Sequence, residues 1–135
     1  MTLAVQANVE SDVAASFDTL GYGVTSTGTN LQALIKQHGV VIKVNQVGGL
    51  LSKSQGKYRC VIEVYAATYD KAWGTASAIT SRFVAGHSWA SGVLIDADYC
   101  ESSFAERPYA EGTRCLNSTW VLTVRHATRK ARLTP

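Results

Sequence analysis

The pattern of hydrophobic and polar positions changes its period twice along the chain, and before residue 40 it is helical. Residues 10–20 and 30–38 carry apolar side chains three and four positions apart, which predicts two short helices. A connector rich in Gly, Ser and Thr spans residues 21–28, and Thr29 or Asn30 is expected to cap the second helix, which ends at Gly39. The apolar positions of the two helices are Val13, Phe17, Leu20, Leu31, Leu34 and Ile35.

From residue 40 the period shortens to two, and the β-branched run over residues 40–47 predicts a strand. Gly48 and Gly49 are expected to end this strand, residues 50–57 to form a polar loop, and residues 58–67 to return as a second strand of a long β-hairpin. One face of the second strand is expected to carry Tyr58, Cys60, Ile62, Val64 and Ala66, and the other Arg59, Val61, Glu63 and Tyr65.

The helical period returns over residues 69–84, where Ala72, Ala76, Ile79 and Phe83 form one apolar stripe that should pack on the sheet. Two further strands follow over residues 92–101 and 114–126, separated by a loop over residues 102–113. The chain therefore predicts an α+β fold, an antiparallel sheet of about four strands with two or three helices packed on one face. Residues 1–135 are expected to form this single domain, with residues 127–135 as a loose basic C-terminal tail.

Composition narrows the class of protein. With 135 residues and 46% hydrophobic side chains, the chain can bury a core without metal or disulfide staples. A net charge of +3 permits an acidic partner, but 17% charged residues is low for a protein whose main task is to bind nucleic acid.

Cys60, Cys100 and Cys115 lack zinc-module spacing and are expected to be reduced thiols, although Cys100 and Cys115 could face each other across neighbouring strands. Neither a signal peptide nor a membrane span is predicted.

No residue pattern predicts a catalytic, metal or cofactor site. His38, His87 and His126 fall on separate predicted elements without metal-ligand spacing, and no nucleophile motif is present. Asp96 and Asp98 share one face of a strand, as paired catalytic carboxylates can, but the solvent face of an edge strand is the favoured interpretation. The tryptophans expected to close the core between helix and sheet are Trp73, Trp89 and Trp120.

The order of the elements and several short motifs together resemble one family. The motifs are Val47-Gly48-Gly49, Val64-Tyr65-Ala66-Ala67 followed by Ala72-Trp73, Glu101-Ser102-Ser103, Glu106-Arg107-Pro108-Tyr109, Arg114, and Trp120-Val121-Leu122-Thr123-Val124-Arg125. Over residues 29–126 this pattern is similar to the tail terminator proteins of long-tailed, siphovirus-type bacteriophages. Residues 1–28, with the first predicted helix and the connector, depart from the shorter leader of that family.

The resemblance implies a virion structural protein and not an enzyme. Such a protein forms a homohexameric ring on the end of the tail tube, stops tube polymerisation and offers the surface on which the head-tail connector or stopper protein docks. It implies assembly in the host cytoplasm, a place at the neck end of the tail, and DNA that passes through the lumen without specific binding. It implies no cofactor, metal or membrane. The alternatives are a head-completion or neck protein on the connector side and, less favoured, a small α+β enzyme.

The candidate contact residues lie where the regular spacing of apolar core residues stops. Residues 47–57 end the hairpin with the apolar pair Leu50-Leu51 in an otherwise polar loop, as expected of a contact tip. Residues 102–114 form the second long loop, and both are expected to supply axial or lateral contacts. The candidates are Val47, Gly48, Gly49, Leu50, Leu51, Ser52, Lys53, Glu106, Arg107, Tyr109 and Arg114.

Overall fold

The computed structural model of the chain describes residues 2–5, 13–15, 17, 20–25, 30–51, 55–85, 87–90, 93–109, 112–125 and 127–130. Two helices are α2 Leu31–His38 and α3 Tyr69–Val84, and residues 13–15 form a further helical turn. The strands are β1 Thr2–Val5, β2 Tyr22–Thr25, β3 Val40–Leu51, β4 Gln55–Ala66, β5 His87–Ala90, β6 Val93–Arg107, β7 Arg114–Arg125 and β8 Ala127–Lys130. The α+β class predicted from the sequence is confirmed.

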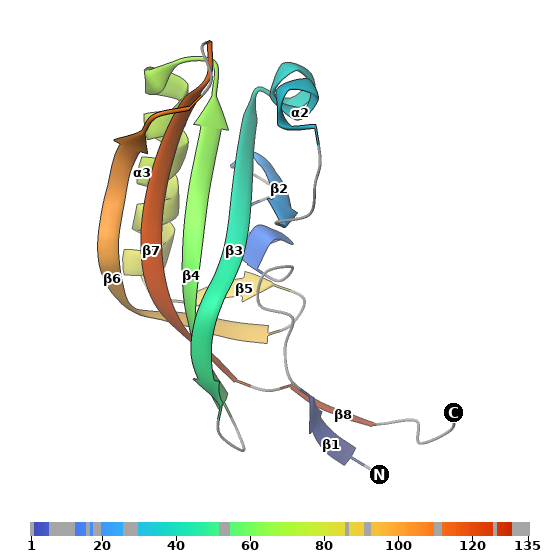
Figure 1. The fold of residues 1–135 in the computed structure, drawn as a ribbon. Helices are drawn as coiled ribbons and strands as arrows, with labels where there is room; N and C mark the ends of the chain where they lie inside the picture. Colours follow the sequence, from blue (N-terminus) through green and yellow to red (C-terminus); the bar gives the residue numbers. More distant parts are fainter. Residues whose placement is uncertain are drawn as a thin grey trace.

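Six of the eight described strands form one sheet in the order β2-β3-β4-β7-β6-β5, with α3 across one face (Figure 1). The long strands β3, β4, β7 and β6 pair antiparallel, as the hairpin pattern predicted. The sheet is wider than the expected four strands, because β5 pairs antiparallel with the start of β6 and β2 pairs parallel with β3. The stretch predicted as a connector thus holds a strand. At Gly23 a Cβ would meet the Ala14 carbonyl oxygen at 2.4 Å, so only glycine lets residues 13–15 cross β2 this closely.

The main core lies between α3 and one face of the sheet. The predicted stripe is buried, and α3 has the predicted bounds. The five residues expected on one face of β4 are each 1% exposed or less. Trp120 closes the core as predicted, since its ring lies 4.7 Å from that of Phe83. Phe17 packs edge-on against the same Phe83 ring at 5.5 Å, so the first predicted helical segment also joins this core.

Helix α2 begins and ends where the sequence predicted. The Asn30 side-chain oxygen accepts a hydrogen bond from the Ala33 amide at 3.3 Å. At the other end the Gly39 amide donates to the Ile35 carbonyl at 2.8 Å, and the Gly39 φ of 85° is a conformation that glycine adopts at low cost. These caps satisfy backbone groups that an eight-residue helix would otherwise leave open.

The position of α2 differs from the expected packing of all helices on one face. Ile35 of α2 packs with Val41, Tyr65 and Cys115, which lie on the sheet face opposite α3. The reason is that β3 is apolar on both faces at this end, where the adjacent Val41 and Ile42 are both fully buried. An uninterrupted apolar run gives no period from which the covered face can be read.

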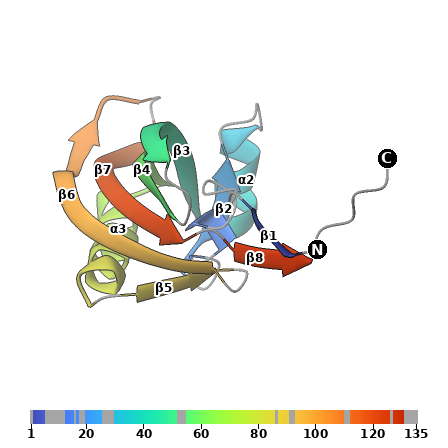
Figure 2. The ribbon, with the colours of Figure 1, turned by 90° about the horizontal axis from the view of Figure 1, so that it is seen from below.

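Three predicted boundaries are wrong because strand pairing continues where the apolar alternation breaks. β3 runs through Gly48 and Gly49 to Leu51, with an irregularity between Gln46 and Gly48. β6 continues to Arg107 with three register shifts, so most of the predicted second loop is strand. Ala127–Lys130, predicted to be loose, pairs with Thr2–Val5 in a two-stranded ribbon that stands apart from the main sheet (Figure 2). Bulges absorb the extra residues and keep the backbone hydrogen bonded.

Candidate interaction surfaces

The candidate contact residues gather at opposite ends of the sheet. The tip of the β3–β4 hairpin lies at one end, and the β6–β7 connection lies at the other, beside α2 and the start of α3 (Figure 1). The 12 residues of β4 connect the two ends and span about 40 Å at about 3.3 Å per residue. The candidates therefore form two separate surfaces, and we name them the hairpin end (Val47–Leu51 and Gln55–Lys57) and the aromatic end (Tyr69, Trp73, Glu106, Tyr109 and Arg114).

The hairpin end is built around a bulge. Val47 sits at the register shift and is 54% exposed, which is high for an apolar strand residue. Gly48 has a φ of 154°, which side chains rarely allow, and a Cβ on Gly49 would lie 2.3 Å from the Lys57 carbonyl oxygen. The two glycines therefore bend the strand without ending it, and pairing continues to Leu51. Outside the described residues lie Ser52, Lys53 and the side chains of Leu50 and Leu51.

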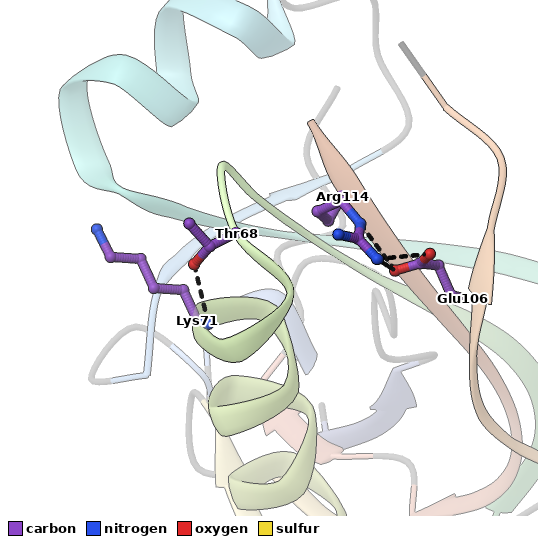
Figure 3. A network of polar contacts seen from close by, with 4 residues as sticks. All are labelled: Thr68, Lys71, Glu106 and Arg114. Carbon is purple, nitrogen blue, oxygen red and sulfur yellow. Dashed lines mark hydrogen bonds and ion pairs between the residues drawn. The ribbon is translucent and has the colours of Figure 1, made fainter. Parts of the chain in front are cut away.

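At the aromatic end Glu106 and Arg114 form a bidentate ion pair. Arg114 Nε donates to Glu106 Oε2 at 2.9 Å and Nη2 donates to Oε1 at 2.8 Å. Figure 3 shows the pair near the start of α3, where Thr68 Oγ1 accepts from the Lys71 amide at 3.3 Å. The two charged side chains remain 45% and 39% exposed, so the pair stabilises the fold by only about 0–1 kcal/mol. Its main effect is to hold the guanidinium of Arg114 in one orientation.

Two exposed aromatic rings, those of Tyr69 and Trp73, lie in a row beside the Arg114 guanidinium. Arg114 Cζ lies 5.4 Å from the centroid of the Tyr69 ring, and the Tyr69 and Trp73 rings are parallel with centroids 6.3 Å apart. Tyr69 is 40% exposed and Trp73 is 47% exposed. The prediction that Trp73 closes the core is therefore wrong. Trp73 follows the buried Ala72 by one residue, and one helical step turns a side chain by about 100°.

Tyr109 of the aromatic end contacts the buried residue Tyr65. Its ring packs edge-on against Tyr65 with centroids 5.1 Å apart, and it is 47% exposed. The Tyr65 hydroxyl donates to the Glu63 carboxylate. Burial, and then this hydrogen bond, raise the pKa of Tyr65 above its ordinary value, so the hydroxyl keeps its proton as the donor. Arg107, the last residue of β6, is exposed.

Cys115 lies opposite Tyr65 on the neighbouring strand. Its Sγ donates to Asn117 Oδ1 at 2.9 Å, and burial raises the pKa of the thiol to about 11. All three cysteines are free, as predicted. Cys100 and Cys115 do not face each other, because their Cα partners are Trp120 and Arg107.

Helix α2 is tied to the aromatic end. Gln32 Nε2 donates to Thr113 Oγ1 at 2.9 Å, just before β7 begins. An open depression of about 540 Å³ lies between α2 and the start of α3, and Lys36 and Lys71 are among its lining residues. The surface at this end of the sheet therefore includes contributions from both helices and two strands.

Sequence reasoning found part of the aromatic end. Glu106, Tyr109 and Arg114 were candidates, and the structure places them at one end of the sheet. Tyr69 and Trp73 were missed as surface residues. A usable signal was present, because the two rings are four residues apart and both lie outside the apolar stripe of α3.

Of the residues of the enzyme alternative, Asp96 and His87 are Cα partners on paired strands, whereas His38 lies at the end of α2. His38 stacks on Tyr22 with ring centroids 4.0 Å apart. Asp96 has His87 of β5 as its Cα partner on one side and Thr123 of β7 on the other, so its predicted place on an edge strand is wrong. No cluster of three or more metal-ligating side chains occurs within the described ranges. Side chains outside the described part are those of His87, Trp89, Asp96, Asp98 and His126.

No protein-family model matches this chain, and no curated protein matches it in sequence. In the part of the chain that the structure covers, neither helix has the length and apolar character of a membrane span.

Proposed function

We propose that this chain is the tail terminator of a long-tailed bacteriophage. It forms a homohexameric ring on the end of the tail tube, stops tube polymerisation and provides the joint to the head connector. The observation that carries the proposal is the separation of two contact surfaces at opposite ends of one sheet. A ring subunit held between two different partners needs two unlike axial surfaces. The resemblance of residues 29–126 to this family supports the same function.

We assign the tail tube to the hairpin end. Val47 offers an exposed apolar side chain there. The bulge before Gly48 and Gly49 interrupts the regular alternation of side chains between the two faces of the sheet. A projecting hairpin presents backbone groups and side chains together, which suits docking on a repeating protein surface.

We assign the head connector or stopper protein to the aromatic end. Tyr, Trp and Arg are the residue types that contribute most to binding energy at protein interfaces, and Tyr69, Trp73 and Arg114 lie side by side here. Glu106 holds the Arg114 guanidinium in place before binding, which lowers the entropy cost of contact.

In this proposal the protein is a structural component without enzymatic activity, cofactor or membrane partner. It assembles in the host cytoplasm and is part of the virion at the neck end of the tail. DNA passes through the lumen of the ring without specific binding.

The test is tube capping. Tubes assembled from a tail-tube protein encoded beside this chain are mixed with the purified protein, and negative-stain images are scored for tube ends that carry a ring and for tube length. We expect the wild type to decorate ends and to limit length. Decoration of connector particles in place of tube ends would contradict the proposal and favour a head-completion or neck protein.

A hairpin deletion sharpens this test. Gly49 is the Cα partner of Tyr58, so removing residues 50–55 leaves Gly56 and Lys57 as a two-residue turn, a length and composition common in β-hairpins. We expect a folded protein, shown by an unchanged circular dichroism spectrum, that no longer caps tubes. Gln37→Ala, an exposed change on α2, is the control and should cap normally. Normal capping by the deletion variant would refute a tube contact through residues 50–55 of the hairpin.

A further inference from the structure

The open depression between α2 and the start of α3 brings together two cations from different helices. Lys36 lies in the last turn of α2 and Lys71 in the first turn of α3, and both side chains line the depression. Figure 3 shows the Lys71 side chain pointing away from the Glu106–Arg114 pair. The lysine charges therefore belong to the depression and not to the ion pair beside it.

The positive charge of this depression is not neutralised within the described part of the chain. Neither Lys36 nor Lys71 forms an ion pair with another described residue, and none of the described lining residues is acidic. Asp70 precedes Lys71 in the sequence but does not line the depression, and the Glu106 carboxylate is bound by Arg114. Two exposed ammonium groups are thus open to a carboxylate or phosphate from another molecule.

The walls of the depression are fixed before any partner binds. Gln32 Nε2 donates to Oγ1 of the buried Thr113 at 2.9 Å, which ties α2 to the start of β7. Thr68 Oγ1 accepts from the Lys71 amide at 3.3 Å, which caps the first turn of α3. A site whose walls are already held in place loses less entropy on binding.

The rest of the lining favours a protein segment over a nucleic acid. Ala33, Ile35 and Ala67 make part of the lining apolar. Binding to a nucleic acid backbone depends on a row of cations along the strand, whereas this depression offers two. The exposed Tyr69 and Trp73 rings at the same end of the sheet are of the types that contribute most at protein interfaces.

We propose that the depression between α2 and α3 binds an acidic segment of a partner protein, whose carboxylates pair with Lys36 and Lys71. The inference rests on the proposed function for the partner's identity, because that function places the head connector or stopper protein at the aromatic end. Small apolar side chains of the segment lie against the alanines and Ile35. The volume of about 540 Å³ is of the size that holds a short stretch of chain.

The test uses a labelled oligo-glutamate peptide as the probe, with fluorescence anisotropy in about 50 mM NaCl, where the screening length is about 14 Å. We expect the wild type to bind the probe and the double variant Lys36→Gln with Lys71→Gln to bind it about tenfold more weakly, because two charge pairs are lost. The matched control is Ser77→Glu with Ser81→Glu, which lowers the net charge by the same amount at exposed positions of α3. It should bind like the wild type, and thermal unfolding shows that each variant is folded.

Equal loss of binding in both double variants would overturn the site, because only the net charge would then matter. Failure of the wild type to bind the probe would overturn it as well. A labelled oligothymidine that binds more tightly than oligo-glutamate, with the same dependence on Lys36 and Lys71, would overturn the choice of a protein partner.

The site and the proposed function fail separately. Probe binding that depends on the two lysines, in a protein that never caps tubes, refutes only the function. Tube capping by a protein whose probe binding ignores the two lysines refutes only the site. If both hold, the lysine double variant should cap tubes like the wild type and join fewer tails to heads.

Discussion

At the scale of single residues, adjacent positions on β4 face different environments. Ile62 is fully buried against α3, whereas Val61 is partly exposed on the other face. We expect Ile62→Ala to lower the free energy of unfolding by about 2–5 kcal/mol, because it removes buried contacts and leaves a cavity. Val61→Ala, the matched control, should cost less than about 1.5 kcal/mol. Urea denaturation measures both values, and equal losses would contradict the assigned faces.

The buried thiol of Cys115 gives a prediction on pH. Burial raises its pKa from 9.0 to about 11. Between these values the unfolded chain loses the thiol proton while the folded chain keeps it, so the free energy of unfolding falls as the pH rises, by at most about 1.4 kcal/mol per pH unit from this group. Below pH 9 both states are protonated and Cys115 adds no slope.

Urea denaturation from pH 8 to pH 11 checks this Cys115 prediction. The Cys115→Ala variant should lose stability less steeply with pH than the wild type. Leu116→Ala, which destabilises the core but keeps the thiol, should retain the wild-type slope. Parallel curves for the wild type and Cys115→Ala would show that the thiol is not shifted.

At the scale of elements, the two helices allow a test of backbone effects alone. A Cβ at Gly74 in α3 or at Gly39 after α2 would meet no atom within 4 Å. Gly74→Ala should raise the free energy of unfolding by about 0.5–1 kcal/mol, because alanine is the better helix former. Gly39→Ala should lower it by about 1 kcal/mol, because φ is 85° there. Thermal unfolding gives both signs, and the same sign for both variants would contradict the helix boundaries.

The elements also show what a sequence can predict. α3 and the caps of α2 were predicted because helical period and capping residues act locally, as with Asn30 and Gly39. The continuation of β6 to Arg107 and the pairing of β1 with β8 were not predicted, because they depend on backbone pairing with strands distant in sequence. For the same reason only part of the aromatic end was predicted: Glu106, Tyr109 and Arg114, but not Tyr69 and Trp73. Its loop residues have a local signal, but the contact of Arg114 with Tyr69 exists only once β7 lies beside α3.

At the scale of the whole molecule, the sheet separates two candidate contact surfaces. Strand direction places the hairpin end and the aromatic end about 40 Å apart. A subunit of a closed ring uses its sides for neighbours and its ends for axial partners. The hairpin end and the aromatic end therefore use different residues and can be impaired one at a time.

This separation predicts two distinct failures in tail assembly. The double variant Trp73→Ala with Tyr109→Ala removes two exposed rings from the aromatic end, and because both are about half exposed its stability should change little. We expect it to cap tubes at normal length but to yield tails that do not join heads. The hairpin deletion of residues 50–55 should instead give overlong tubes. Electron microscopy of assembly mixtures measures the tube length and the fraction of tails joined to heads for each variant, with the wild type as reference. If both variants fail at the same step, the two ends of the sheet do not serve separate partners.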